Sequence, residues 1–233
     1  RKNMNEEHKR EARILKDIMS PTFYNAMTTS KGYLAGGAIR GVFCSEPIVD
    51  FDIFFRSRIN FDNFVSSFDK GESPTFTTTD TAWTHIDEDK VTYQLICAEF
   101  GEPSEVIKKF DFSCCMGAWE PEKGFILDKQ FLKHCSQHRL VFNANAGFPI
   151  CSMWRAIKFI KRGWKLPAIE SIKLALSINH LNLTNHAELK RQLLGIDTLF
   201  LKELTDALEK DKAVAYDFGE AIEMLMAFVD KED

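Results

Sequence analysis

The sequence predicts an α+β fold: a head of residues 1–147, with a small mixed sheet and flanking helices, followed by an all-helical domain of residues 148–233. Two observations support this division. In the first part, short runs of β-branched and aromatic residues alternate with segments whose apolar residues recur at helical spacing. From Pro149 onward only the helical spacing remains, with apolar positions at Ile150, Met153, Trp154, Ile157 and Ile160. The boundary between the head and the helical domain is placed where the pattern changes, within residues 143–148.

The same patterns predict the individual elements. Strands are expected over residues 33–35, 49–55, 75–83, 91–97, 110–119 and 140–142. Helices are expected in the head over residues 6–19, 38–43, 57–70, 103–109 and 129–135, and in the second part from Pro149 to a stop at Gly163 and over 168–178, 185–194, 197–210 and 216–229. Ser20-Pro21 is expected to end the first helix, because the residue before a proline disfavours helical backbone.

A phosphate site is suggested by the glycine pair Gly36-Gly37, which lies between an expected strand and an expected helix. Glycine allows the backbone to approach a ligand closely and to adopt a positive φ. A helix N-terminus adds free N–H groups and the positive end of a dipole, which suit an anion. The alternative is a tight turn without a ligand.

Two carboxylates follow at Asp50 and Asp52, inside an apolar run. If residues 49–55 form a strand, both carboxylates lie on one face, and the apolar side chains lie on the other. Two carboxylates so close repel each other unless a cation lies between them. Mg²⁺ suits this place because it binds oxygen ligands and keeps positions for substrate phosphates. The alternative is a strand face that is merely solvated.

The chain has the composition of a soluble globular protein, with 233 residues, 45% hydrophobic and 27% charged. No apolar run approaches the ~20 residues that span a bilayer, and the charged first ten residues lack the apolar core of a signal peptide. We therefore expect a cytoplasmic protein without a membrane segment. The six cysteines form no Cys-x-x-Cys pair, which favours buried, reduced thiols. A net charge of −4 argues against broad nucleic-acid binding through charge alone.

Gly36-Gly37-Ala38-Ile39-Arg40, followed by Asp50-Phe51-Asp52, resembles the head of the polymerase-β-type nucleotidyltransferases. The resemblance is closest to the tRNA-CCA-adding and bacterial poly(A) polymerase branch. That branch has Gly-Gly-x-x-Arg, then Asp-x-Asp, and later a third carboxylate in Arg-Asp-Phe-Thr-x-Asn. Residues 109–114 read Lys-Phe-Asp-Phe-Ser-Cys here, so Asp111 matches the third carboxylate. The motifs cover about residues 32–116, and a weaker match extends to about residue 166.

The resemblance implies an enzyme that transfers a nucleoside monophosphate from an NTP to an acceptor hydroxyl and releases pyrophosphate. Asp50, Asp52 and Asp111 would hold two Mg²⁺ ions, and Asp111 would help to lower the pKa of the hydroxyl. Gly36 and Gly37 would bind the nucleotide. Arg40 contacts phosphate or lies on the solvent side of its helix. Arg155, which matches the first arginine of the family's Arg-Ala-x-Arg-Phe helix, lines the nucleotide cleft or a solvated helix face.

One departure concerns base selection. CCA-adding enzymes read the incoming base with Glu-Asp-x-x-Arg. Counting back from Arg155, those places hold Phe148, Pro149 and Ser152, so the base-reading carboxylate and arginine are missing. We therefore do not expect ordered addition of C, C and A. The expected acceptor is an RNA 3′ end, such as that of tRNA. The alternatives are a toxin-like enzyme that nucleotidylates a protein or a small molecule, and a noncatalytic nucleotide-binding module.

Overall fold

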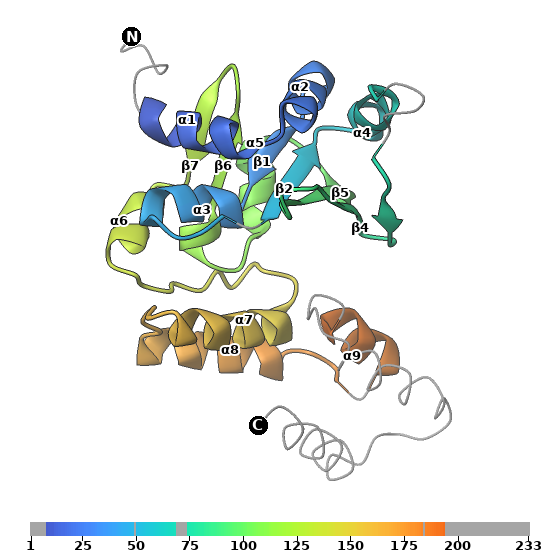
Figure 1. The fold of residues 1–233 in the computed structure, drawn as a ribbon. Coiled ribbons are helices and arrows are strands. Elements are labelled where there is room, and N and C mark those ends of the chain that lie inside the picture. The colour runs from blue at the N-terminus through green and yellow to red at the C-terminus, as the bar shows by residue number, and fades with distance from the viewer. Residues whose placement is uncertain (1–7, 49, 69–73, 184, 194–233) are drawn as a thin grey trace. The chain divides into compact units, whose positions relative to one another are not determined.

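A computed structural model of the protein describes residues 8–48, 50–68, 74–183 and 185–193 (Figure 1). The chain divides into two compact units, Arg1–Asn145 and Ala146–Asp233. The first unit contains strands and helices and the described part of the second contains helices, so the predicted α+β class is confirmed. The expected division after residue 147 into separate folding domains stays a prediction, and the helices expected over residues 197–210 and 216–229 lie outside the described residues.

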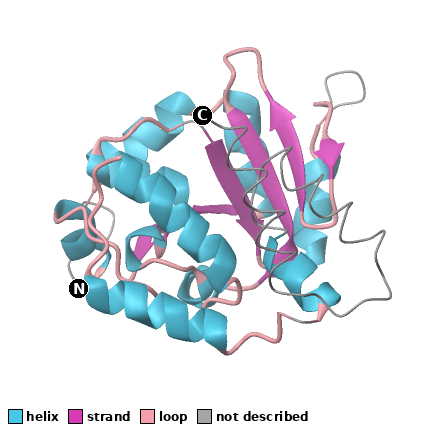
Figure 2. Ribbon diagram, turned by 90° about the horizontal axis from the view of Figure 1, so that it is seen from below, coloured by secondary structure: helices cyan, strands magenta, loops and turns pink. Residues whose placement is uncertain are grey.

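The first unit is built on a seven-stranded mixed sheet in the order β3-β4-β5-β2-β1-β6-β7 (Figures 1 and 2). Its strands are β1 (Tyr33–Ala35), β2 (Asp50–Phe55), β3 (Thr77–Thr78), β4 (Ala82–Ile86), β5 (Thr92–Phe100), β6 (Gly117–Glu120) and β7 (Gly124–Leu127). β2 pairs in parallel with β5 and antiparallel with β1. The remaining pairs are antiparallel. The strands β1 and β2 are therefore central, with three strands beyond β2 and two beyond β1.

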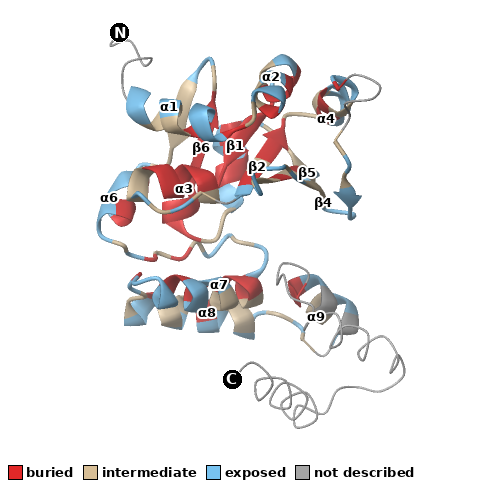
Figure 3. Cartoon of the chain, in the orientation of Figure 1, coloured by how far each residue is buried: buried red, intermediate tan, exposed pale blue. Residues whose placement is uncertain are grey.

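Five helices cover one face of the sheet: α1 (Lys9–Ile18), α2 (Pro21–Ser30), α3 (Gly37–Cys44), α4 (Arg58–Ser66) and α6 (Phe131–Ser136). The alternate residues Phe51, Ile53 and Phe55 of β2 are fully buried on this face. The ring of Phe55 packs edge-on against Phe61 and Phe64 of α4, with ring centroids 5.4 and 5.5 Å apart. Figure 3 shows buried residues concentrated in β1, β2 and α3. Burial of large aromatic side chains supplies most of the stabilisation here, at about 1.5–3 kcal/mol each.

The opposite face is covered where the short helix α5 (Pro103–Val106) and the 3₁₀ turn Ile107–Lys109 cross it. Phe54, the β2 residue on this face, joins Tyr33, Val106 and Ile107 in a second core cluster. Asp50 and Asp52 lie on the same side of β2 but at its beginning, outside that cluster. The alternation predicted for residues 49–55 is thus confirmed for the described residues 50–55.

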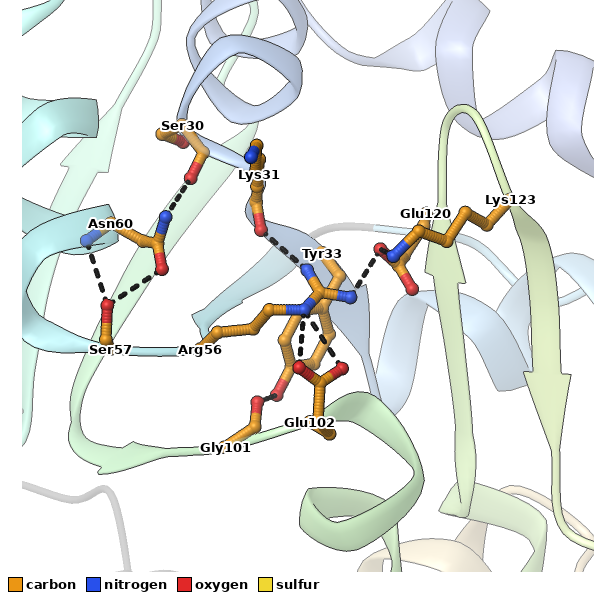
Figure 4. Close-up of polar contacts among 10 residues, drawn as sticks. All are labelled: Ser30, Lys31, Tyr33, Arg56, Ser57, Asn60, Gly101, Glu102, Glu120 and Lys123. Atoms are coloured by element: carbon orange, nitrogen blue, oxygen red, sulfur yellow. Dashed lines mark hydrogen bonds and ion pairs between the residues drawn. The ribbon is translucent and has the colours of Figure 1, made fainter.

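A polar network ties the far end of β2 to its neighbours (Figure 4). Arg56 donates from Nε to the Glu102 carboxylate at 3.0 Å and from Nη2 to Glu120 at 2.6 Å. Its Nη1 donates to the Lys31 carbonyl at 2.9 Å, and the Tyr33 hydroxyl donates to the Gly101 carbonyl at 2.9 Å. Burial is the larger cause that raises the pKa of Tyr33 well above its ordinary value, so the hydroxyl stays a donor. The network fixes the sheet at the end away from the aspartates.

The prediction that Ser20-Pro21 ends the first helix is confirmed, because α1 ends at Ile18. The same residues also begin α2, which was not predicted: the Ser20 hydroxyl accepts from Phe23 N at 3.3 Å, and Pro21 occupies the first helical turn. Two strand predictions in the second half of the head were wrong. The strand expected over residues 110–119 is confined to Gly117–Glu120 and is preceded by a 3₁₀ turn at Ser113–Cys115. Of residues 140–142, only Phe142 forms an isolated bridge, with Phe112. The strand β7 was not expected.

The described part of the second unit contains α7 (Pro149–Lys161), α8 (Ala168–Asn179) and α9 (His186–Leu193). Gly163 adopts a φ of 86° just after α7, which confirms the predicted stop. Phe159 and Trp164 pack edge-on with ring centroids 5.3 Å apart. Among the described helices, none is long and apolar enough to cross a membrane. All six cysteines lie in the described residues, where none forms a disulfide, and Cys114, Cys115, Cys135 and Cys151 are buried.

Candidate active site

The glycine pair forms a sharp turn between β1 and α3. Gly36 has a φ of 84° and a ψ of −122°, and α3 begins at Gly37. The turn is tied to the sheet because Gly36 N donates to the Gly117 carbonyl at 3.0 Å. The Gly36 carbonyl accepts from Arg40 N at 3.1 Å, which closes the first turn of α3. The backbone N–H groups at this helix start can therefore face an anion.

Both aspartates of β2 lie beside this turn. A Cβ built on Gly36 would be 3.8 Å from Asp52 Oδ2, and one built on Gly37 would be 4.0 Å from Asp50 Oδ1. Asp50 is exposed and Asp52 is half-buried. The structure thus brings together the two motifs that the sequence placed far apart, and a triphosphate at the glycine turn would have two carboxylates next to it.

Two further polar residues extend this face and were missed by sequence reasoning. In the parallel pairing of β2 with β5, Asp50 is opposite Thr92 and Asp52 is opposite Gln94. Residues opposite each other in a pair share a face of the sheet. Alternation within residues 91–97 could have predicted that Thr92 and Gln94 share a face, but not that they adjoin the aspartates, because this depends on the register between strands.

Asp111 lies in an irregular loop and not on a strand, contrary to the sequence prediction. Its Oδ1 accepts from Phe112 N at 2.9 Å, and its carbonyl accepts from Asn143 N at 2.7 Å. The preceding residue reaches the glycine turn: the Phe110 ring lies 3.4 Å from a Cβ built on Gly36. The loop of Asp111 therefore adjoins the same turn as Asp52.

The described residues contain no group of three His, Cys, Asp or Glu side chains arranged to hold a metal ion. The structure accordingly brings Asp50 and Asp52 to the glycine turn without assembling them with Asp111 into a three-ligand group. Mg²⁺ commonly takes only one or two carboxylates and completes its shell with water and substrate phosphates. The oxygen donors of Asp50 and Asp52 fit that requirement, and the role predicted for Asp111 stays a prediction.

Arg40 points into the protein. Its side chain is buried, Nε donates to Glu46 Oε2 at 3.0 Å, and Nη1 contacts Cys115 Sγ at 3.6 Å. Burial works to lower the pKa of Arg40, but its contacts with Cys115 and Glu46 outweigh burial, and the net shift is upward. The alternative that placed Arg40 on the solvent side is wrong. Its contact with phosphate stays a prediction, for which Glu46 is a competing partner.

The residues at the base-reading places belong to α7 in the second unit. Pro149 and Ser152 are buried, and the Ser152 hydroxyl donates to the Phe148 carbonyl at 3.0 Å. Neither presents a charged group. Arg155 is exposed on the same helix, and its predicted role in nucleotide binding stays a prediction.

The comparisons with known proteins give two results. A model of the Gabija anti-defense 2 protein family matches residues 6–138. "Gabija anti-defense 2" of Bacillus phage SPbetaL7 is 30% identical over 211 residues, which cover 89% of this chain and 52% of that protein. The chain thus spans about half the length of this curated relative.

The second result concerns the fold. A Bacillus stearothermophilus CCA-adding enzyme in complex with CTP has a TM-score of 0.54 at 16% identity, over 76% of this chain and 48% of that one. The Thermotoga maritima CCA-adding enzyme complexed with tRNA has a TM-score of 0.55 at 11% identity, over 85% and 53%. A CCA-adding enzyme with ATP reaches 0.59 at 14% identity, over 78% and 49%. These matches confirm that the fold resembles that of CCA-adding enzymes, as the motifs predicted.

Proposed function

The chain belongs to the Gabija anti-defense 2 family, and on this premise we propose that it is a Mg²⁺-dependent nucleotidyltransferase that modifies a component of the Gabija defence system. It transfers a nucleoside monophosphate from an NTP to a hydroxyl of that component and releases pyrophosphate. One observation carries the proposal: Gly36 and Gly37 lie beside Asp52 and Asp50, respectively, at the start of α3.

The residues of the head have separate tasks in this reaction. The N–H groups at the start of α3 bind phosphate oxygens of the NTP, which the positive end of the helix dipole favours. Asp50 and Asp52 would hold Mg²⁺, which would neutralise the triphosphate and stabilise the charge that develops on the attacking and leaving oxygens. Asp111 accepts the proton of the acceptor hydroxyl as the hydroxyl oxygen bonds to the α-phosphorus, and the bond from that phosphorus to the leaving pyrophosphate breaks.

The choice of acceptor follows from the family and from α7. A relative named for its action against Gabija favours a component of that system over a cellular tRNA. The buried Pro149 and Ser152 support this choice, because they lack the hydrogen-bonding groups that ordered CCA synthesis needs. A site without such groups discriminates between bases by only ~1–3 kcal/mol. We therefore expect one NTP, or several with modest preference, to serve as donor.

The proposal is tested by incubating the chain with Mg²⁺, each α-labelled NTP in turn, and either purified Gabija components or total RNA with tRNA lacking its last three nucleotides. We expect label on a Gabija component, release of pyrophosphate, and loss of both with Asp52→Asn. Asp62→Asn is the matched control, because Asp62 is an exposed aspartate of α4 paired with Arg58. Label on RNA alone would indicate that the acceptor is an RNA 3′ end and not a Gabija component. NTP binding without pyrophosphate release would indicate a noncatalytic module.

A further inference from the structure

The loop that carries Asp111 is held in part by bonds from residues about 30 positions further along the chain. After α5, the chain passes through the 3₁₀ turn Ile107–Lys109 and then bends at Phe110 and Asp111. Phe110 N donates to the Ile107 carbonyl at 3.2 Å, which closes the turn. Beyond that point the carbonyls of the bend need donors from elsewhere in the chain, because buried or half-buried backbone groups are costly when unpaired.

Asn143 supplies these donors. Its Nδ2 donates to the Lys108 carbonyl at 2.7 Å and to the Phe110 carbonyl at 2.9 Å, and its backbone N donates to the Asp111 carbonyl at 2.7 Å. Its Oδ1 accepts from Asn145 N at 3.1 Å, which orients the carboxamide. One residue therefore binds three carbonyls within four consecutive positions, each at a short distance for an N–H···O bond.

The neighbours of Asn143 hold the next part of the same loop. Ser113 N donates to the Val141 carbonyl at 3.1 Å, and Phe112 bridges Phe142. These bonds are made by backbone and do not depend on the identity of residue 143. The side chain of Asn143 therefore controls the part of the loop before Asp111, where no strand pairing exists.

We propose that Asn143 is a positioning residue that holds the carboxylate of Asp111 at the site of transfer; this inference rests on the proposed function. The carboxylate takes its direction from the backbone at Asp111 and Phe112, because Oδ1 accepts from Phe112 N. The Asn143 side chain holds the Phe110 carbonyl just before that backbone, while the bond from Asn143 N to the Asp111 carbonyl is a backbone bond that the variants below keep. It also holds Phe110, whose ring lies against the Gly36 turn. A carboxamide is needed because it offers two N–H donors, whereas aspartate and leucine offer none.

The test compares Asn143→Leu and Asn143→Asp with the control Asn145→Leu. The control residue is exposed and contributes its backbone N to Asn143, which substitution of the side chain keeps. We expect both Asn143 variants to lower kcat by about 10- to 100-fold, as a misplaced reacting group does, with KM for the NTP within about twofold of wild type. Hydrogen exchange should quicken in peptides covering residues 108–113, and Asn145→Leu should change neither measurement.

A double-mutant comparison separates positioning from general stability. In an Asp111→Asn background, Asn143→Leu should lower the residual kcat by less than about twofold, because the group it positions is already gone. A full additional loss there, or unchanged exchange over residues 108–113, would overturn the inference. Wild-type kcat in both Asn143 variants would also overturn it while leaving the proposed function intact. A wild-type chain that transfers no nucleotide would instead overturn the proposed function, and with it the catalytic purpose assigned to Asn143.

Discussion

Gly36 and Gly37 look equivalent in the sequence, yet the structure predicts opposite effects of alanine on stability. Gly36 has a φ of 84° and a ψ of −122°, a region that residues with a Cβ avoid. The closest atom to an added Cβ is Phe110 Cε2 at 3.4 Å, which is ordinary contact. The cost of Gly36→Ala is therefore backbone strain and not a clash, about 1–3 kcal/mol. For a chain of this size that corresponds to a Tm lower by about 2–12 °C.

Gly37→Ala is the matched variant. Gly37 is the first residue of α3, has no positive φ, and leaves an added Cβ 4.0 Å from its nearest neighbour, Asp50 Oδ1. Alanine there restricts the unfolded chain, so the free energy of unfolding should stay unchanged or rise by about 0.4–1 kcal/mol. Its methyl group nevertheless points at the proposed phosphate site, and we expect NTP-dependent transfer to fall in both variants.

Urea unfolding and pyrophosphate release, measured on the same preparations, distinguish the two requirements. A Gly36→Ala protein as stable as wild type would refute the argument from backbone conformation. A Gly37→Ala protein with wild-type turnover would refute the placement of the phosphates at the start of α3. The pair is informative because only Gly36→Ala is predicted to lower stability, whereas both substitutions are predicted to lower transfer.

The remaining predictions concern the carboxylates, the ligand, the ion pairs and the thiols. Asp50→Asn and Asp52→Asn should abolish transfer without lowering the Tm measured in the absence of metal, since neither side chain packs on the buried face of β2. Mg²⁺ with an NTP at a hundredfold excess over Kd should raise the free energy of unfolding by about 2.7 kcal/mol, or the Tm by about 5–11 °C. Adding a chelator should remove most of this stabilisation. Arg56→Met should lower the free energy of unfolding by about 1.5–3 kcal/mol, because Glu120 is 6% exposed and loses a 2.6 Å hydrogen bond from Arg56. The control is Arg58→Met, which removes an exposed ion pair with Asp62 and should lower it by under about 1 kcal/mol. Hydrogen bonds between thiols, and then burial, raise the pKa of Cys114 and Cys135. The folded chain therefore keeps protons that the unfolded chain loses above about pH 8.5, and the free energy of unfolding should fall there by about 1.4 kcal/mol per pH unit for each thiol. Urea unfolding between pH 7.5 and 9.5 measures this slope, and Cys135→Ala should flatten it.

The central part of the head was predictable because local rules and tertiary packing agree there. One face of β2 packs against the helices, and the other is exposed to solvent only at the start of the strand. The alternation of apolar and charged residues in its sequence therefore matches which of its side chains are buried. The glycine pair marked the β1–α3 turn for a similar reason, because Gly36 adopts a φ that other residues avoid. The proximity of the two motifs came from the resemblance to a family, and no local pattern contains it.

Arg40 shows the limit of reasoning about helix faces. A helix of eight residues has little amphipathic signal, and an arginine on it is usually exposed. Here Glu46 follows the helix closely and offers its carboxylate to Arg40 at 3.0 Å, which makes burial of the guanidinium tolerable. The pairing depends on the loop after α3 folding back, and the sequence pattern carries no information about that fold.

Residues 110–119 illustrate the same limit more sharply. The alternation rule that succeeds in β2 fails here because the segment from Phe112 to Glu120 is buried throughout, whichever way each side chain points. A run of this kind is compatible with a strand, a helix or an irregular loop. What decides between them is which groups pair with the backbone of this part of the chain. The Val141 carbonyl accepts from Ser113 N, and Asn143 donates to the carbonyls just before Phe112. If Asn143 positions Asp111 as proposed, then the place of the third carboxylate depends on an asparagine that no motif includes. Asp111→Asn asks whether Asp111 acts in the reaction, and Asn143→Leu asks whether its place in the loop matters.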